Sequence, residues 1–335
     1  MKNGGMILSL ANIKIILINS MNYNNLIFVG TTSNHGKDFI ELPPKKIFGI
    51  ECKNYSVNSE AVLYELFDKN PEATFVLDVE KKQKYSLINL VKNYKNNVRF
   101  IDYKPNDITL EAADIAILKY YGYDLYGKSI GVYGTGNISF KLALRLVERN
   151  CNVFLYGRNE EKVKDICKVI NNITFGNQFI EQGQFNEQLD CFVSFVSAKE
   201  IISSTYLDLL NADALCIDGG IGNFTKDFIE KANELGLNVR RLDVRQANEV
   251  LEGYIKSKLD NSFDAIIGKN TINDINIVAG GIIGKDSEII VDRIDSPNRV
   301  IGVANGIGGL KSSDNLSKKD LERIENINEY IRENK

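Results

Sequence analysis

The chain has 335 residues, a length that suits two domains better than a single core. Its hydrophobic content of 44%, charged content of 25% and net charge of -3 are typical of an ordinary soluble globular protein. Lysines are scattered among Asp and Glu without a basic stripe, and no apolar run reaches the ~18 residues of a membrane span, so neither nucleic acid nor a membrane is an expected partner.

The cysteines and the histidine limit the compartment and the metal chemistry. Five cysteines form no CxxC pair, and Cys191 and Cys216 lie in apolar, strand-like runs, which predicts buried thiols in a reduced, cytoplasmic protein. Residues 1–20 do not read as a signal peptide, because Asn12 and Lys14 interrupt the apolar run. The single histidine, His35, cannot form a metal cluster alone, so no metal site is expected.

The first third of the chain alternates between strand and helix patterns. We expect strands or hairpins over residues 6–18, 26–29, 46–50, 74–77 and 98–101, and helices over 59–67 and 85–94. Such alternation indicates a largely parallel sheet covered on both faces. This N-terminal α/β substrate domain is predicted to span residues 1–107, and a helix over 108–122 then leads into the next domain.

Residues 128–158 predict a strand, a glycine loop, a helix and a second strand in one unit of about 30 residues. A tight turn requires the first glycine, close approach of a pyrophosphate requires the second, and contact between helix and strand requires a small residue three positions later. Free backbone N–H groups at the helix start would bind the anion. The predicted phosphate-binding residues are Gly134, Thr135, Gly136, Asn137, Ile138 and Ser139. The alternative is a tight turn only, or a site for another nucleotide-like ligand.

The end of the second strand distinguishes between the two dinucleotides. An NAD site places Asp or Glu there, whereas this chain has Arg158 and Asn159, with Lys162 one turn into the next helix. A guanidinium grips a 2′-phosphate in a bidentate way, so NADP is the expected cofactor. The alternatives are that Arg158 is merely solvated, or that Glu160 or Glu161 reaches the ribose.

The remaining chain continues the pattern and then changes. Helices are expected over 160–170, 204–210, 225–235 and 246–258, and strands over 191–196, 214–217 and 239–242. They complete a doubly wound Rossmann domain over residues 108–258. In a C-terminal region of residues 259–335, β segments are expected over 275–283, 288–294 and 300–303, followed by a charged helix over 318–333 that docks back on the body of the protein. This C-terminal β-rich segment and helix is also the expected interface of a homodimer.

Further cofactor contacts are expected at the ends of later strands. Ser197 should end the strand that faces the nicotinamide ribose, and Gly219 and Gly220 should permit close backbone approach to the ring. The glycine-rich loop over 305–309 is expected to do the same, with a plain turn as the alternative.

Several of these motifs resemble known families. The lead YGYDLYGK at 121–128, the glycine loop, the strand at 190–197, CIDGGI at 216–221 and VANGIGG at 303–309 resemble methylene-tetrahydrofolate dehydrogenase/cyclohydrolase. GRNEEK at 157–162 and Gln246-Ala247 resemble shikimate dehydrogenase about as closely. Both belong to the two-domain aminoacid-dehydrogenase-like group, which implies an N-terminal substrate domain ahead of an NADP-binding domain. The choice between the two, and therefore the substrate, stays open.

Hydride transfer also needs a group that donates or accepts a proton. The candidates are Lys45 or its neighbour Lys46, His35 and Asp107. Lys45 follows Leu-Pro-Pro, which faintly resembles a shikimate dehydrogenase motif, and a partly desolvated amine titrates near neutrality. The alternatives are a solvated loop lysine, an exposed loop histidine and a helix N-cap, respectively. Two acidic strand ends, Asp78 with Glu80 and Lys81, and Asp102 with Lys104, are candidates for binding a polar substrate, with helix capping as the alternative.

The sequence therefore predicts an NADP(H)-dependent oxidoreductase that acts on a small polar metabolite such as a hydroxy acid, amino acid, imine or C1-pterin. A non-catalytic NADP-binding regulatory protein and a nucleotide-dependent transferase are the alternatives.

Overall fold

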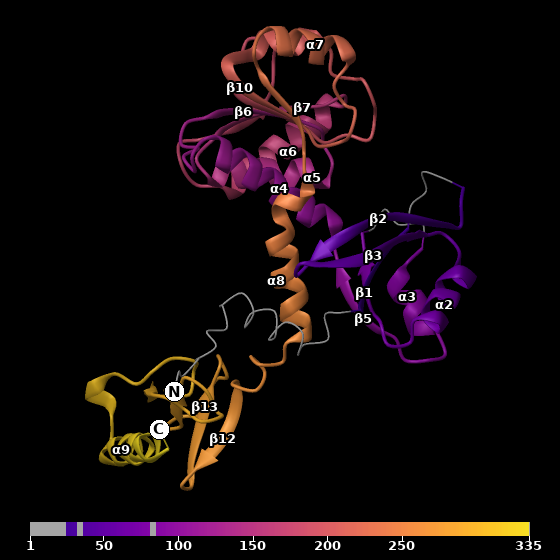
Figure 1. Cartoon of the computed structure of the whole chain (residues 1–335). Coiled ribbons are helices and arrows are strands. Elements are labelled where there is room, and N and C mark those ends of the chain that lie inside the picture. Colours follow the sequence, from indigo (N-terminus) through magenta and orange to yellow (C-terminus); the bar gives the residue numbers. More distant parts are fainter. Residues whose placement is uncertain (1–24, 32–35, 81–84, 335) are drawn as a thin grey trace, which may run out of the picture. The chain divides into compact units, whose positions relative to one another are not determined.

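The computed structural model describes residues 25–31, 36–80 and 85–334 (Figure 1). The chain divides into two compact units, Met1–Tyr254 and Ile255–Lys335. A five-stranded and a six-stranded sheet lie in the first unit and a four-stranded sheet in the second. The strand or hairpin expected over residues 6–18 falls outside the described residues, as does His35.

The five-stranded sheet is largely parallel, as predicted. It contains β1 (Leu26–Gly30), β2 (Phe39–Ile47), β3 (Ile50–Val57), β4 (Thr74–Asp78) and β5 (Arg99–Tyr103) in the order β2-β3-β1-β4-β5. Only the edge strand β2 runs antiparallel to its neighbour. Helices α2 (Glu60–Lys69) and α3 (Leu87–Asn93) bury Leu63, Phe67 and Leu87 in a core with Ile27 and Phe75 of the sheet.

The structure corrects the strand expected over residues 46–50. Phe48 and Gly49 both have positive φ, 51° and 79°, and form the two-residue turn of a β2–β3 hairpin. Strand β2 was not predicted over its full length because Pro43 and Pro44 interrupt its strand pattern. They lie at an irregularity of the register between Leu42 and Lys45, and an edge strand tolerates proline at such a place.

The six-stranded sheet is wholly parallel and has the order β8-β7-β6-β9-β10-β11, the doubly wound order 3-2-1-4-5-6. Its strands are β6 (Ser129–Tyr133), β7 (Asn152–Tyr156), β8 (Ile180–Gln182), β9 (Leu189–Ser194), β10 (Leu210–Asp218) and β11 (Asn238–Arg241). The helices are α4 (Pro105–Tyr120), α5 (Asn137–Glu148), α6 (Glu160–Ile173), α7 (Lys226–Glu234) and α8 (Asn248–Leu259), with 3-10 turns η2 (Ser204–Leu209) and η3 (Val244–Ala247). Ligands bind beyond the carboxyl ends of such strands, where the strand order reverses, which is between β6 and β9 here.

Helix α4 starts earlier than expected and packs on α5. It begins at Pro105 because proline suits the first helical position, whose N–H needs no partner. The side chain of Asp114 on α4 is 3% exposed, and it pairs with Arg145 of α5 and with Arg149, the C-cap residue of that helix. Arg149 donates to both Asp114 oxygens, Nε to Oδ1 at 2.7 Å and Nη2 to Oδ2 at 2.6 Å, and Arg145 donates to Oδ2 at 3.3 Å. This ion-pair cluster, in which the carboxylate is buried and the two arginines are partly exposed, ties the two helices together.

The second unit has a sheet in the order β12-β13-β14-β15 and one long helix. Its elements are β12 (Gly268–Ile272), β13 (Ile275–Ala279), β14 (Ile289–Val291), β15 (Val300–Val303), the 3-10 turn η4 (Ser313–Asn315) and α9 (Lys318–Glu333). A capping box between Ser317 and Asp320 starts α9. Its Ile327 and Ile331 are buried in a core with the sheet of the same unit, while Leu321 is exposed.

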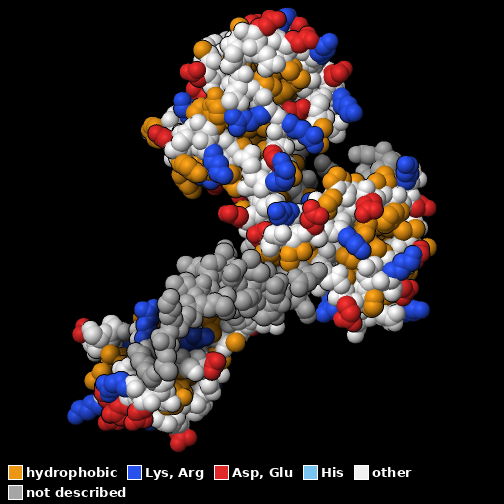
Figure 2. Space-filling model, in the orientation of Figure 1, with side chains coloured by type: hydrophobic (Ala, Val, Ile, Leu, Met, Phe, Trp, Pro, Cys, Tyr) orange, Lys and Arg blue, Asp and Glu red, His pale blue; other side chains and the backbone are white. Residues whose placement is uncertain are grey.

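The predicted fold class is confirmed: an N-terminal α/β sheet, a doubly wound Rossmann sheet, and a C-terminal strand-rich segment with a helix. All five cysteines are buried and free. Within the described ranges, none of the helices is both long and apolar enough to cross a bilayer. On the visible face of the described surface, Lys and Arg side chains lie among Asp and Glu side chains (Figure 2).

Candidate cofactor-binding site

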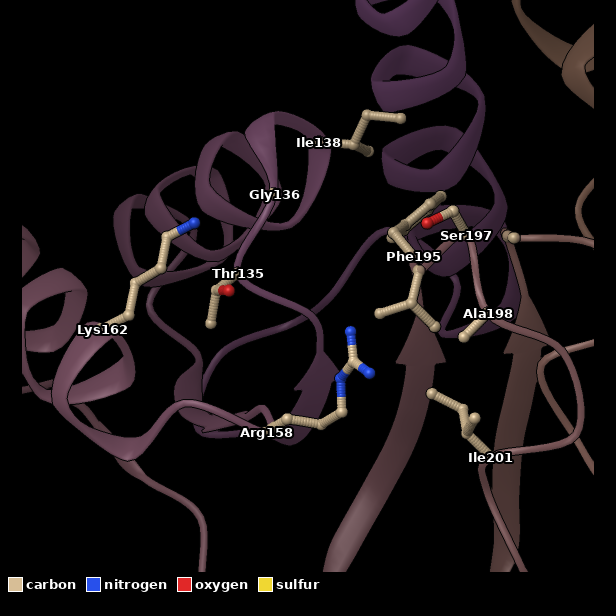
Figure 3. A pocket seen from close by; sticks show the side chains of 12 residues that line it. Thr135, Gly136, Ile138, Arg158, Lys162, Phe195, Ser197, Ala198 and Ile201 are labelled. Atoms are coloured by element: carbon tan, nitrogen blue, oxygen red, sulfur yellow. The ribbon is translucent and has the colours of Figure 1, made fainter. Parts of the chain in front are cut away.

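A pocket of about 370 Å³ lies at the carboxyl ends of β6, β7, β9 and β10, at the predicted crevice (Figure 3). Its volume falls within the range of small-molecule and cofactor sites. It is lined by Thr135, Gly136, Ile138, Arg158, Lys162, Phe195, Val196, Ser197, Ala198, Ile201, Gly219 and Gly220. Eight of these twelve residues are among the predicted cofactor contacts. The other four predicted contacts, Gly134, Asn137, Ser139 and Asn159, do not line the pocket.

The glycine loop after β6 has the geometry that the sequence predicts. Gly134 has φ +132°, and a Cβ there would lie 2.6 Å from Ser139 Oγ and 2.7 Å from the Phe195 carbonyl oxygen, so glycine is required. A Cβ on Gly136 would meet nothing within 4 Å, so the space beside this residue is open. Ser139 is fully buried directly beneath the turn, which explains the small residue there.

The start of α5 faces this loop and has backbone donors to offer. Gly136 is the N-cap residue, and no side chain caps the helix. In the same domain, Asn159 caps α6 and Thr225 caps α7 with their side chains. The first N–H groups of an α-helix have no partner within the helix and attract anions. The loop and the helix start therefore suit a phosphate group.

Two cations stand at the side of the pocket next to β7. The Arg158 side chain extends from the end of β7 toward the space between Thr135 and Phe195, and Lys162 approaches from the first turn of α6 (Figure 3). Both side chains are exposed. The side-chain oxygen of Asn159 accepts from the N–H of Lys162 at 2.9 Å, so Asn159 serves as a helix cap. Among the described residues that line the pocket there is no Asp or Glu.

The opposite wall comes from the loops after β9 and β10. Ser197 lies exposed on this wall, but in the loop beyond Ser194, where β9 ends, and not at the end of the strand as expected. Gly219 and Gly220 line it too, but the space where their side chains would lie is occupied by other residues of the protein. A Cβ on Gly219 would lie 2.1 Å from the Phe195 ring, and one on Gly220 would lie 2.2 Å from Asn223 Oδ1. Close packing of the two loops accounts for both glycines in this structure.

Of the three predicted proton-handling residues, the structure describes Lys45 and Asp107, which lie on different elements, β2 and α4. Lys45 lies half-buried on β2, with its amine 5.4 Å from the centre of the Phe28 ring. Asp107 is not an N-cap, because α4 begins at Pro105 with Lys104 as its N-cap; its carboxylate pairs with Lys141 of α5 instead. His35 lies outside the described residues.

The glycine-rich loop over 305–309 belongs to the second unit. The Asn305 side-chain oxygen accepts from the N–H groups of Ile307 and Gly309 at 3.0 and 2.9 Å, which closes the loop on itself. Hydrogen bonds within the loop are typical of a plain turn, the alternative given for this segment.

Sequence reasoning missed two residues that build the pocket wall. Phe195 lines the pocket, and the side chain of Asn223, which is fully buried, connects the loops after β9 and β10. For Asn223, the sequence shows only an asparagine that follows a glycine-rich run after a strand. Such an asparagine looks like an ordinary turn residue.

Replacing Gly134 by alanine is expected to lower the free energy of unfolding by about 2 kcal/mol, because the new methyl group overlaps Ser139 and Phe195 at a φ that favours glycine. Gly136→Ala is the matched control: its methyl group meets open space at φ -90°, so we expect only the cost of alanine at a helix N-cap, about 1 kcal/mol or less. Urea denaturation of the two variants measures both values. Equal stability of both variants would contradict the steric explanation.

Comparison with known proteins agrees with the sheet topology. Residues 129–243 match the family model of the NAD-binding domain of 6-phosphogluconate dehydrogenase, so the chain carries an NAD-binding domain. No curated protein sequence matches the chain significantly.

Several solved structures are distantly similar to the chain. One of the subunits of dipicolinate synthase from Bacillus halodurans is 13% identical, with 72% of this chain and 82% of that chain covered and a TM-score of 0.37. L-tryptophan dehydrogenase from Nostoc punctiforme is 13% identical, with 62% and 63% covered and a TM-score of 0.41. CAD from Helicobacter pylori, complexed with NADP(H), is 20% identical, with 46% and 44% covered and a TM-score of 0.32. Similarity at this level carries no information about activity.

Proposed function

We propose that this protein is an NADP(H)-dependent oxidoreductase that transfers a hydride to or from a small polar metabolite: a hydroxy acid, an amino acid, an imine or a C1-pterin. The observation that carries the proposal is the pocket at the carboxyl edge of the doubly wound sheet, which is lined by the uncapped start of α5 and by two cations. The match to an NAD-binding domain supports it. A bound nicotinamide would supply or accept the hydride.

The preference for NADP rests on charge. Arg158 and Lys162 line the pocket at the end of β7, where an NAD site needs a carboxylate to accept from the ribose hydroxyls. The 2′-phosphate of NADP would instead form charge-assisted hydrogen bonds with a guanidinium. Glu160 and Glu161 are exposed in the first turn of α6 and do not line the pocket.

Titration of the full chain with each reduced dinucleotide tests the proposal. NADPH fluorescence should change on binding, with a dissociation constant at least about tenfold lower than that of NADH, because one charge-assisted hydrogen bond contributes about 1.5–3 kcal/mol. Tighter binding of NADH would reject the cofactor preference. No binding of either dinucleotide would reject the proposed function.

For the proton we propose Lys45, assisted by Asp78. Burial lowers the pKa of the Lys45 amine, and the Asp78 carboxylate opposes this only in part. Burial also raises the pKa of Asp78 to about 6, against the opposing effects of a hydrogen bond from the Glu80 backbone N–H and the charge of Lys45. An amine whose pKa is lowered by burial gives up its proton more readily, so it can donate a proton to a substrate oxygen or nitrogen, or accept one from it. Perturbed groups of this kind are enriched at functional sites.

The raised pKa of Asp78 gives a test based on stability. In the wild type this group makes stability fall as the pH rises from about 4 to about 6, because the native state holds the proton longer than the unfolded chain does. Asp78→Asn removes the buried charge, so above about pH 6 we expect it to raise the free energy of unfolding by about 1 kcal/mol, a value reduced for partial solvent exposure. Near pH 4 the gain should vanish.

Urea denaturation across this pH range measures the effect. Glu51→Gln, which neutralises an exposed carboxylate of β3 in the same sheet, is the control and should change stability by less than about 0.5 kcal/mol at any pH. A loss of stability in Asp78→Asn at neutral pH would show that this carboxylate serves the fold and not a site.

A further inference from the structure

The side chain of Asn223 is fully buried between the loops after β9 and β10, and every hydrogen-bonding position of its amide is used. Its Oδ1 accepts from Ser194 Oγ at 2.8 Å and from the Val196 N–H at 3.3 Å. Its Nδ2 donates to the carbonyl oxygens of Val196 at 2.9 Å and Ala198 at 2.8 Å. The orientation of the amide is fixed, because a flipped group would set its NH2 against an N–H donor and its oxygen against two carbonyls.

The backbone of Asn223 adds to this connection. Its carbonyl oxygen accepts from the N–H groups of Ile201 and Ile202 at 2.9 and 3.0 Å. Its own N–H donates to Asp218 Oδ2 at 3.1 Å, and the same carboxylate accepts from the N–H groups of Gly220 and Gly222. Asp218 thus holds the loop after β10, and Asn223 holds the loop after β9 against it.

The loop held in this way forms one wall of the pocket. Val196, Ala198 and Ile201, each bonded to Asn223, all line it, and Phe195 and Ser197 lie between or beside them. A Cβ on Gly220 would lie 2.2 Å from both Asn223 Oδ1 and the Val196 carbonyl oxygen. Glycine at this position therefore makes room for the asparagine side chain.

We propose that Asn223 is the positioning residue of the cofactor pocket: its amide sets the conformation of residues 195–201, and through them the affinity for the dinucleotide. Asn223 itself does not line the pocket, so it affects cofactor binding only through the conformation of that loop. The inference rests on the proposed function, since it needs a dinucleotide in this pocket.

The isosteric variant Asn223→Asp separates this role from simple loss of packing. At about pH 8 an aspartate places an acceptor against the Val196 and Ala198 carbonyl oxygens, where the wild type has a donor, so the loop must move. Burial among carbonyl groups favours the protonated form of such a carboxyl, and its O–H restores one of the two lost donors as the pH falls. The defect should therefore be dependent on pH, which a packing defect is not.

The experiment measures the dissociation constant of NADPH by fluorescence for the full chain at about pH 8 and about pH 6. At each pH, the dissociation constant of the variant is divided by that of the wild type, which removes the effect that titration of NADPH itself has on binding. We expect a ratio of about 10 to 100 at the higher pH, and at most about a third of that value at the lower pH. Ile170→Ala removes a fully buried side chain of α6 away from the pocket and controls for lowered stability, with an expected ratio near one at both pH values.

If Asn223→Asp does not fold, Ser194→Ala gives the second test. It removes one donor to Asn223 Oδ1 without lining the pocket, and it should weaken NADPH binding about 2- to 10-fold. A ratio near one for either folded variant at the higher pH, or an Asn223→Asp ratio that is the same at both pH values, overturns the inference. A wild-type chain that binds neither NADPH nor NADH would instead reject the proposed function.

Discussion

Alanine in place of Arg158 is expected to weaken NADPH binding about 10- to 100-fold and NADH binding by less than about threefold. The guanidinium extends into the pocket from the end of β7, at the position where a doubly wound domain meets the 2′ position of the ribose. Only NADPH carries a phosphate there, so only NADPH loses a charge-assisted hydrogen bond. Fluorescence titration with both dinucleotides measures the two losses separately.

Two further variants sharpen this test. Lys162→Ala removes the second cation of the pocket and should cost NADPH only a few-fold in affinity, because an ammonium acts as a point charge without bidentate geometry. Lys168→Ala removes an exposed lysine of the same helix that does not line the pocket, and should leave both dissociation constants unchanged. Equal losses of NADPH and NADH in Arg158→Ala would show that the arginine does not read the 2′-phosphate.

Asp114→Ala is expected to lower the free energy of unfolding by about 3–5 kcal/mol, the largest stability change predicted for this chain. The Asp114 residue is 2% exposed, and its carboxylate accepts three hydrogen bonds from Arg145 and Arg149. Its removal leaves Arg149 without this carboxylate partner next to Arg145, which keeps its ion pair with Glu111. Because the side chains of both arginines are about a third exposed, water relieves part of this cost, so the lower end of the range is expected.

Glu111→Ala is the matched control for this ion-pair cluster. Glu111 accepts a hydrogen bond from Arg145 at 2.8 Å, but its side chain is 29% exposed, so its loss should cost about 1 kcal/mol or less. Urea denaturation measures the free energy of unfolding of both variants, and an m-value equal to that of the wild type would show that the change is one of stability alone. A cost below about 1 kcal/mol for Asp114→Ala would mean that the fold does not depend on this cluster.

The doubly wound sheet was predictable because its signals are local. The run from β6 through Gly134 to α5 changes from a strand period to a helix period within a few residues, and Arg158 follows directly after the next strand. The pocket then follows from topology, since strand ends next to each other in a parallel sheet bring their loops together.

Other features depend on information that short windows do not contain. Helix α4 starts at Pro105 and not at Ile108, so the alternative of Asp107 as helix N-cap is wrong, and its carboxylate pairs with Lys141. The polar strand β12, GKNTI, was missed because its place is set by pairing with β13. The role of Asn223 depends on bonds to residues more than 20 positions earlier, and nothing in its own neighbourhood indicates them.

The five buried cysteines affect how the pocket can be studied. A thiolate is the species that reacts with alkylating reagents. Burial raises the pKa of Cys52 and Cys167 to about 11 and that of Cys151 and Cys216 to about 12, and it raises the pKa of Cys191 well above its usual value. The native protein therefore offers its own thiols poorly to maleimide or iodoacetamide. A cysteine introduced at exposed Ser197 would accept a fluorophore at the mouth of the pocket against a low background, without prior removal of any natural cysteine.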